Sequence, residues 1–277
     1  IELNCVQTPA IAEVWFGDFF RDWAVVGLED TSIAITSPEN FDELEGAAKR
    51  LGTRWHPGLI RLRLPWRPPC RLVSIEGDTV PAPESLSPSI RYLAYGSSIT
   101  HGNASVRPTS MYASRVAQRL DVDLINMGFG GGAHLEESIA GYIAERDDWT
   151  FGTFEMGINL ISHIDPGEFE RRVDRFVDIV VEAHRDKQLY FLDLFTCRFD
   201  FGERDMRIKI GEFRNIVQAK IGSIRLANVK YVNGKELLTG AGSLTVDLVH
   251  PSPSGMETIA ERLSPLIAGD MQKSKKL

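Results

Sequence analysis

The period of the hydrophobic pattern changes near residue 90. Before that point the apolar residues form short β-like runs separated by turn residues, at 23–28, 31–36, 59–64 and 71–75. In the third run Ile60, Leu62 and Leu64 alternate with arginines, which predicts a strand with one buried face. We therefore predict a small β-sandwich domain over residues 1–88, which ends in a Gly- and Pro-rich linker at 77–89.

After this linker, strand-like and helix-like segments alternate. The strand candidates lie at 91–95, 122–126, 151–156, 188–194 and 227–232. The helical patterns lie at 110–120, 135–145, 168–184, 204–221 and 254–267. This alternation predicts an α/β domain over residues 89–277, with a parallel sheet covered by helices on both faces. Functional residues are expected at the carboxyl ends of the strands.

The first of these strands runs into the small-residue turn Gly96-Ser97-Ser98-Ile99-Thr100. Gly96 and its small neighbours permit a tight exit from a buried strand, which would expose Ser98 as a candidate nucleophile. On this stretch alone, hydroxyl caps in an ordinary strand-to-helix loop explain the residues equally well.

A candidate partner for Ser98 lies far downstream, in Asp247-Leu248-Val249-His250-Pro251. A serine hydroxyl needs a base to take its proton, and the base needs a third group that fixes its tautomer. Among the six histidines, only His250 follows an acidic residue by three positions in a loop that opens a helix. We therefore predict Asp247 and His250 as the orienting acid and the base.

These motifs resemble the SGNH hydrolases, the GDSL esterase and lipase superfamily, over residues 91–267. The resemblance places the nucleophile on Ser98 and the triad acid and base on Asp247 and His250. It also places the oxyanion hole on the backbone N–H groups of Ser98 and Gly131 and the side-chain amide of Asn159, which lie in Asn126-Met127-Gly128-Phe129-Gly130-Gly131 and Gly157-Ile158-Asn159. The implied fold is a flavodoxin-like three-layer α/β/α domain, preceded here by a jelly-roll-like β-sandwich.

Two positions depart from the usual family pattern. Ser97 stands where many members have Asp before the nucleophile, and Leu160 stands where many have Asp after the oxyanion Asn. The Gly-Ser-Ser-Ile-Thr block resembles a branch whose members often carry an N-terminal β-domain and deacetylate carbohydrates. Leu160 leaves the hydrogen bonding behind Asn159 open.

Charge and cysteine content limit the partners and the compartment. The 277 residues include 31 Lys and Arg and 38 Asp and Glu, a net charge of -7, which disfavours nucleic acids and anionic membranes. Cys5, Cys70 and Cys197 are odd in number and widely spaced, so we predict free thiols in a reducing, cytoplasmic compartment. The N-terminus does not resemble a signal peptide, and a trimmed secretion leader stays open.

Two short motifs suggest other kinds of site, one for a dinucleotide and one for a metal ion. Gly128 to Ala133 formally matches a dinucleotide fingerprint, but that motif belongs on the first strand of its sheet, where the Ser98 turn stands. His163 and Asp165 provide only two metal ligands in a loop. We predict no cofactor and no metal.

The predicted function is hydrolysis of a short-chain, acetyl-like ester of a carbohydrate or another polyhydroxylated molecule. One alternative is an acyltransferase that uses the same triad. Another is a carbohydrate-binding protein with a degenerate hydrolase domain, whose β-domain aromatics would stack on sugars; we favour these aromatics as core residues. They are Trp15, Phe16, Phe19, Phe20, Trp23, Trp55 and Trp66. The segments 196–204 and 234–246 are the loops expected near the site, and homo-oligomerisation stays open.

Overall fold

The computed structural model describes residues 1–5, 7–65, 67–83 and 89–274. The chain divides into two compact units. Unit 1 comprises Ile1–Ser89 and the short segment Val106–Thr109, and unit 2 comprises Ile90–Ser105 and Ser110–Leu277. Residues 84–88 of the predicted linker lie outside the described part of the chain.

Unit 1 contains two three-stranded antiparallel sheets. One sheet has the order β4-β1-β6, with β4 at Thr31–Ser32, β1 at Glu2–Cys5 and β6 at Cys70–Ser74. The other has the order β3-β2-β5, with β3 at Phe19–Val26, β2 at Ala10–Phe16 and β5 at Ile60–Arg63. Leu3 and Cys5 of β1 belong to the same buried cluster as Val14 and Val26 of the second sheet. The two sheets therefore share one small core.

The sequence pattern missed three elements of unit 1. These are β1, β2 and the helix α1 at Phe41–Leu51. In β2 the charged Glu13 interrupts the apolar residues, although it is fully buried. Only Ala48 of α1 is buried, so this helix lacks a strong apolar stripe. Its signals are acidic residues in the first turn, basic residues in the last turn and Gly52 in the left-handed conformation at the C-cap.

The aromatic residues of unit 1 are not all core residues, contrary to our interpretation. Phe16 is 4% exposed, whereas Phe20 is 41% and Trp23 is 55% exposed. Their rings lie close together, with centroids 6.1 Å apart. The core interpretation is therefore wrong for Phe20 and Trp23, and Trp66 lies outside the described residues.

Cys5 and Cys70 lie opposite each other where β1 pairs with β6. Their Sγ atoms are 3.0 Å apart, and both are free thiols, as is the buried Cys197. The wide spacing of the cysteines along the chain gave no sign of this proximity, because the antiparallel pairing brings together residues from the two ends of unit 1.

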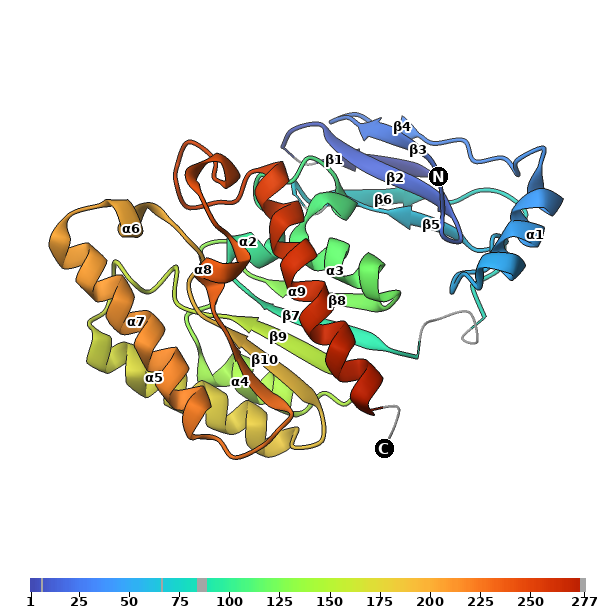
Figure 1. The fold of residues 1–277 in the computed structure, drawn as a ribbon. Helices are drawn as coiled ribbons and strands as arrows, with labels where there is room; N and C mark the ends of the chain where they lie inside the picture. The colour runs from blue at the N-terminus through green and yellow to red at the C-terminus, as the bar shows by residue number, and fades with distance from the viewer. Residues whose placement is uncertain (6, 66, 84–88, 275–277) are drawn as a thin grey trace. The chain divides into compact units, whose positions relative to one another are not determined.

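Unit 2 is built on a five-stranded parallel sheet, as the alternation of segments predicted (Figure 1). Its order is β11-β10-β9-β7-β8, with strands at Val229–Val232, Gln188–Leu192, Phe151–Glu155, Arg91–Gly96 and Asp123–Gly128. Along the chain this is the 2-1-3-4-5 order of flavodoxin-like sheets, in which the first strand lies inside the sheet. β7, which precedes the Ser98 turn, is thus flanked by β8 and β9.

Helices cover both faces of this sheet. α3 (Tyr112–Leu120) packs against α9 (Pro253–Ser274) on one face. α4 (Glu137–Ala144) packs against α5 (Pro166–Ala183), and α5 against α7 (Arg204–Ser223), on the other face (Figure 1). All five residues of β9 are buried, because the strand is central and covered on both faces.

The start of α5 shows how the sequence sets these elements. The Asp165 side chain accepts a hydrogen bond from Glu168 N at 2.9 Å, and Pro166 occupies the first helical position. Phe169, Val173 and Phe176 then recur at three- and four-residue steps and are fully buried. Asp165 is therefore accounted for as a helix cap.

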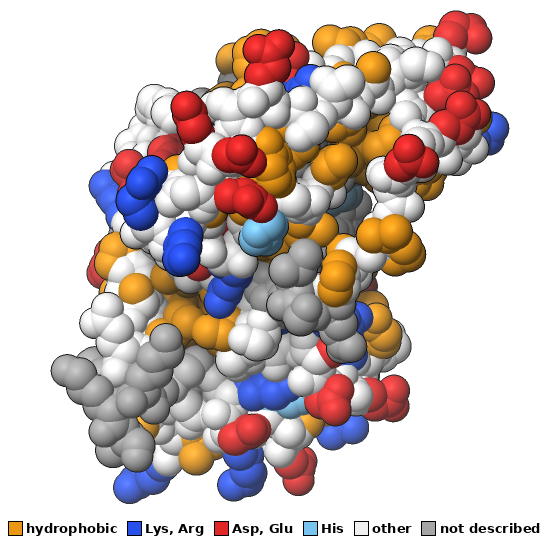
Figure 2. All heavy atoms as spheres, turned by 90° about the vertical axis from the view of Figure 1, so that its right-hand side faces the viewer, with side chains coloured by type: hydrophobic (Ala, Val, Ile, Leu, Met, Phe, Trp, Pro, Cys, Tyr) orange, Lys and Arg blue, Asp and Glu red, His pale blue; other side chains and the backbone are white. Residues whose placement is uncertain are grey.

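Charged side chains of both signs are interspersed among hydrophobic ones on the face shown in Figure 2. Among the described residues, no helix combines the length and apolar character needed to cross a membrane.

Candidate active site

Ser98 begins the short helix α2 (Ser98–His101) directly beyond the carboxyl end of β7. Ser97 is the N-cap of this helix, and its hydroxyl accepts a hydrogen bond from Ile99 N at 3.1 Å. A Cβ atom on Gly96 would lie 2.5 Å from Glu155 Oε2, so the exit from the strand tolerates only glycine. As a result the Ser97 side chain is buried in its capping role, and Ser98 is partly exposed.

Ser98, His250 and Asp247 form a continuous hydrogen-bonded row. Ser98 Oγ lies 2.7 Å from His250 Nε2, and His250 Nδ1 lies 2.6 Å from Asp247 Oδ2. The imidazole thus contacts a hydroxyl through one nitrogen and a carboxylate through the other. This arrangement lets the ring take a proton from Ser98 while the carboxylate fixes its tautomer.

Local hydrogen bonds hold Asp247 in a tight turn. Its Oδ1 accepts from Thr245 Oγ1 at 2.7 Å, from Val249 N at 2.8 Å and from His250 N at 2.9 Å. Leu248 occupies the left-handed region with φ of 57°, which lets the chain fold back so that Asp247 and His250 face each other. Burial alone would raise the pKa of Asp247, but the hydrogen bonds from His250, Val249 and Thr245 outweigh it and lower the pKa far below its usual range.

A buried carboxylate contacts the turn that carries Ser98. Glu155, at the end of β9, is 1% exposed. Its Oε2 accepts a hydrogen bond from Ser97 N at 2.6 Å and from Thr100 Oγ1 at 3.2 Å. Thr100 Oγ1 also lies 2.7 Å from the hydroxyl of the buried Tyr112. Burial raises the pKa of Glu155, although the hydrogen bonds from Ser97 and Thr100 act in the opposite direction.

The loop after β8 is tied to the same turn. Asn126 Nδ2 donates to Thr100 O at 3.0 Å, and Phe129 N donates to Gly96 O at 2.8 Å. Gly131 follows in the left-handed conformation, with φ of 73°. Among the described residues, the backbone N–H groups of Ser98 and Gly131 have no hydrogen-bond acceptor. Both are thus available as donors.

The Asn159 side chain is held by the loop that carries Gly131. Asn159 Nδ2 donates to Gly132 O at 2.5 Å, which uses one of its two amide hydrogens and leaves the other for a ligand. Leu160, which replaces the usual Asp, is 2% exposed and packs in the core. The contact with Gly132 therefore orients Asn159 without a carboxylate behind it.

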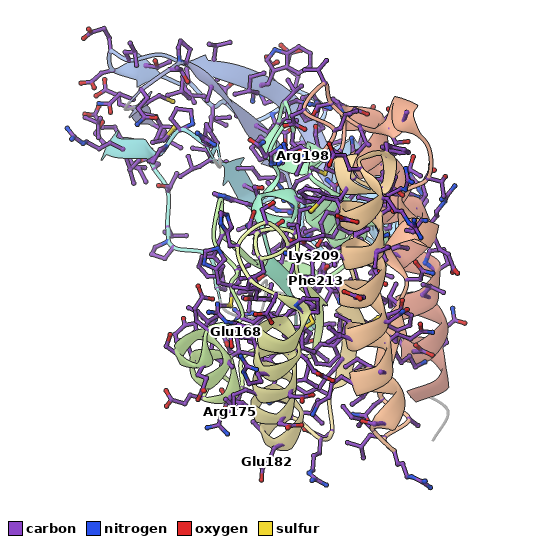
Figure 3. All side chains as sticks on the ribbon, turned by 90° about the vertical axis from the view of Figure 1, so that its left-hand side faces the viewer. Glu168, Arg175, Glu182, Arg198, Lys209 and Phe213 are labelled. Carbon is purple, nitrogen blue, oxygen red and sulfur yellow. The ribbon has the colours of Figure 1, made fainter. Side chains whose placement is uncertain are left out.

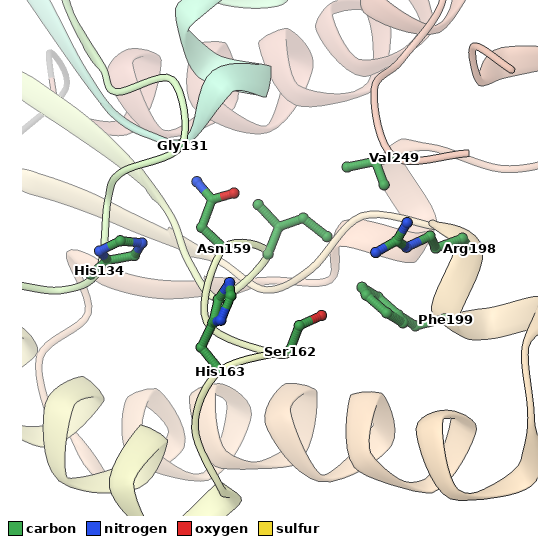
Figure 4. A pocket seen from close by; sticks show the side chains of 9 residues that line it. Gly131, His134, Asn159, Ser162, His163, Arg198, Phe199 and Val249 are labelled. Atoms are coloured by element: carbon green, nitrogen blue, oxygen red, sulfur yellow. The ribbon is translucent and has the colours of Figure 1, made fainter. Parts of the chain in front are cut away.

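A pocket of about 450 Å³ opens beside these donors. It is lined by Gly131, His134, Ile158, Asn159, Ser162, His163, Arg198, Phe199 and Val249. His134 and Arg198 lie on opposite sides of this pocket in Figure 4, with Asn159 between them. Gly131 and Asn159 were predicted from sequence, and Val249 adjoins His250. Arg198 was missed, although it falls within the 196–204 segment expected near the site.

A family model matches residues 91–268, which is more than half of the chain. The chain belongs to the GDSL-like lipase/acylhydrolase family. The matched region begins at β7 and ends within α9, so it contains the Ser98 turn, the segments of Gly131 and Asn159, and the loop of Asp247 and His250. None of the curated proteins matches the chain.

Solved structures share the fold of this chain at low sequence identity. A salicylyl-acyltransferase from a tetracycline biosynthetic pathway is 20% identical, covers 95% of this chain and 74% of its own, and has a TM-score of 0.71. A GDSL-like lipase from Bacteroides ovatus is 16% identical, with 98% and 83% covered and a TM-score of 0.65. A family two carbohydrate esterase from Clostridium thermocellum, in complex with cellohexaose, is 12% identical, with 98% and 88% covered and a TM-score of 0.62.

The described residues contain no group of three or more His, Cys, Asp or Glu side chains placed to hold a metal ion. Asp165 caps α5, and His163 lines the pocket.

Proposed function

We propose that the protein is a serine esterase that transfers a small acyl group from an ester to Ser98 and then to water. The hydrogen-bonded row from Ser98 through His250 to Asp247 is the observation that carries this proposal. The row joins residues 152 positions apart in sequence, and it lies at the carboxyl edge of the sheet, where sites of α/β folds occur.

In the first half of the reaction, Ser98 Oγ attacks the ester carbonyl as His250 Nε2 takes the hydroxyl proton. The tetrahedral intermediate collapses to an acyl ester on Ser98, and His250 gives the proton to the departing alcohol. In the second half, His250 removes a proton from water, which attacks the acyl ester and releases the acid. Asp247 stabilises the charged imidazole in both halves.

The negative oxygen of each intermediate would lie among the N–H groups of Ser98 and Gly131 and the free amide hydrogen of Asn159. The lack of other acceptors for the two backbone groups supports this role. Loss of one such donor typically lowers turnover by ~10² to 10³.

The proposed substrate is a short-chain, acetyl-like ester of a carbohydrate or another polyhydroxylated molecule. The Gly-Ser-Ser-Ile-Thr block and the N-terminal unit, which we propose to be a β-sandwich domain over residues 1–88, support this choice. The similar carbohydrate esterase from Clostridium thermocellum supports it as well. The salicylyl-acyltransferase, similar over 95% of this chain, favours a second candidate in which an alcohol replaces water as the acceptor.

A carbohydrate-binding role with a degenerate hydrolase domain has less support. The exposed Phe20 and Trp23 would suit sugar stacking. However, the hydrogen bonds that join Ser98, His250 and Asp247 support an active hydrolase domain over a degenerate one.

The decisive experiment compares wild type, Ser98→Ala and Ser97→Ala on a short-chain nitrophenyl ester. Ser98→Ala should lower kcat by roughly 10⁴-fold or more. Ser97→Ala should retain substantial activity, because the helix cap that it removes is worth about 1 kcal/mol and the backbone N–H of residue 97 can still donate to Glu155. An arylphosphonate should label Ser98 by mass spectrometry, and equal losses in both variants would contradict the assignment. Supplying an acyl thioester with sugar or polyketide alcohols then distinguishes transfer from hydrolysis.

A further inference from the structure

The pocket beside the oxyanion donors has an unusual charge composition for this chain. The protein carries a net charge of -7, yet none of the nine lining residues is acidic. The lining instead contains the guanidinium of Arg198, two imidazoles and the amide of Asn159. The excess of N–H donors in this pocket suits a ligand group with several oxygen acceptors.

Arg198 is fixed to the catalytic loop through its backbone. It begins the short helix α6 (Arg198–Phe201), and its N–H donates to Leu248 O at 2.6 Å. Leu248 lies between Asp247 and His250, so the position of Arg198 is coupled to the base. In Figure 3 Arg198 lies near the amino end of α7, whereas Lys209 and Phe213 lie further along that helix.

The carboxylate nearest to Arg198 in sequence is already paired elsewhere. Asp200 accepts hydrogen bonds from Arg214 at 2.6 and 2.9 Å and from Cys197 N at 3.0 Å. Arg214 is 9% exposed, so this pair is a buried anchor for α6. It holds the helix in place without neutralising Arg198.

The guanidinium of Arg198 is left available to a ligand. Its carbon lies 4.9 Å from the centroid of the Phe199 ring, and it has no ion pair with any described residue. The guanidinium points into the pocket in Figure 4. Stacking on Phe199 restricts the side chain while leaving the N–H groups free to bind two oxygens of one anion.

We propose that Arg198 binds an anionic group, a carboxylate, phosphate or sulfate, carried by the ester substrate. This inference rests on the proposed esterase function and narrows its substrate class. The scissile carbonyl would lie at Gly131 and Asn159, and the anionic group would extend along the pocket to Arg198. The charge could belong to the acyl part or to the alcohol part, and both would use the same contact.

The test compares anionic esters with neutral twins. Mono(4-nitrophenyl) glutarate carries its charge on the acyl side, and 4-acetoxybenzoate carries it on the alcohol side. The methyl ester of each carboxylate is its neutral twin. For each pair the measured quantity is the ratio of kcat/KM for the anionic ester to that for the neutral ester. The proteins are wild type, Arg198→Gln and Arg185→Gln. The control residue Arg185 is exposed and shortly precedes β10. It therefore lies at the amino-terminal ends of the strands, whereas the site lies at their carboxyl ends.

In at least one pair, wild type should prefer the anionic ester. Arg198→Gln should lower that ratio roughly 10- to 100-fold, as expected for loss of a charge-assisted hydrogen bond. Arg185→Gln should keep the wild-type ratio, and added salt should reduce the preference in wild type. The pair that responds identifies whether the acyl or the alcohol part carries the charge. An unchanged ratio in Arg198→Gln, or a preference for the neutral twin in both pairs, would overturn the proposal.

Failure of the proposed function gives a different result. If Ser98→Ala hydrolyses the neutral esters as fast as wild type, Ser98 is not the nucleophile. Calorimetric binding of the same esters to Ser98→Ala, with and without Arg198→Gln, still tests the anion site. Tighter binding of an anionic ester that depends on Arg198 supports the site, and equal binding with and without Arg198 rejects it.

Discussion

Glu155 is a buried residue that holds the Ser98 turn without contacting the proposed reaction centre. Its Oε2 accepts from Ser97 N and from Thr100 Oγ1, on either side of Ser98. A displacement of the turn by about 1 Å is enough to cost roughly 10²-fold in rate. We therefore expect the position of Ser98 to depend on this carboxyl group.

Glu155→Ala should lower kcat by roughly 100-fold and destabilise the protein by about 2–4 kcal/mol, because it leaves a buried N–H without an acceptor and creates a cavity. Glu155→Gln keeps an acceptor for Ser97 and should retain kcat within about tenfold of wild type. Steady-state kinetics and urea unfolding measure the two effects. Wild-type kcat in Glu155→Ala would show that the turn holds its shape without this residue.

Asp247 is a second residue whose role can be measured. Asp247→Asn places an amide where His250 Nδ1 needs an acceptor, and kcat should fall by roughly 10³- to 10⁴-fold. Asp205→Asn is the control, because Asp205 is exposed in the first turn of α7. Activity near that of wild type in Asp247→Asn would contradict the proposed triad.

The lowered pKa of Asp247 also determines what the pH profile reports. The hydrogen bonds to Asp247 lower its pKa far below the usual range of a carboxyl group. Asp247 therefore keeps its negative charge throughout an ordinary esterase assay. In wild type, log kcat/KM should rise with unit slope as the general base of the reaction becomes deprotonated, and then level off. A profile without this rise would argue against a histidine base.

At the scale of elements, the sequence was most informative where apolar segments are long and periodic. β9 is buried on both faces and α5 has a regular apolar stripe, so unit 2 could be predicted as alternating strands and helices. In unit 1 the burial of the strands is less regular, and β3 has only one fully buried residue. Its pattern shifted the expected strand to residues 23–28, whereas β3 spans Phe19–Val26.

The residues of the candidate site also differ in how clearly the local sequence identifies them. Ser98, Asp247 and His250 lie in short motifs whose residue types already suggest their chemistry, so sequence placed them as candidates. Glu155 and Arg198 carry no such local signal, because their importance comes from contacts with residues far away in the chain. The Ser97–Glu155 hydrogen bond spans 58 positions, and only the folded sheet brings these residues together.

The pairing of β1 with β6 leads to a prediction about oxidation. Oxidised glutathione should join Cys5 and Cys70 in a disulfide, with loss of two thiol hydrogens to the reagent, which leaves as two reduced thiols. Burial, and then the hydrogen bond and charge of Cys5, raise the pKa of the Cys70 thiol, so the reaction should be faster at alkaline pH. A crosslink between residues 65 positions apart should add about 4 kcal/mol to the free energy of unfolding.

Peptide mapping without reductant, followed by thermal unfolding, measures this outcome. Cys197→Ser should form the same crosslink, and Cys5→Ser should not. Recovery of Cys5 and Cys70 only as separate glutathione adducts would contradict the expected pairing.

At the scale of the whole molecule, the two units are not consecutive in sequence. The segment Val106–Thr109 belongs to unit 1, although the chain on both sides of it belongs to unit 2. Thr109 Oγ1 donates to Glu13 Oε1 at 2.8 Å, and Arg107 lies 3.6 Å from the same carboxylate oxygen. Glu13 is fully buried, and both contacts are made to Oε1, whereas its Oε2 has no hydrogen-bond partner among the described residues. The carboxylate therefore depends on these two residues.

Thr109→Val should therefore lower the free energy of unfolding by about 1.5–3 kcal/mol, because it removes a hydrogen bond to a buried carboxylate. Thr79→Val is the control at an exposed threonine and should change stability by less than about 0.5 kcal/mol. Urea denaturation of both variants provides the comparison. Equal stability of the two would mean that Glu13 does not need Thr109.

The return of the chain to unit 1 at Val106–Thr109 also restricts how the two units can be separated or exchanged by gene fusion. A gene-fusion junction near residue 89 would transfer a hydrolase unit that still contains four residues folded against a partner left behind. If relatives exchange unit 1, the segment Val106–Thr109, a few residues downstream of Ser98, must therefore change to match the new unit. We expect the two units to be passed on as a pair, with Glu13 and Thr109 replaced together or not at all.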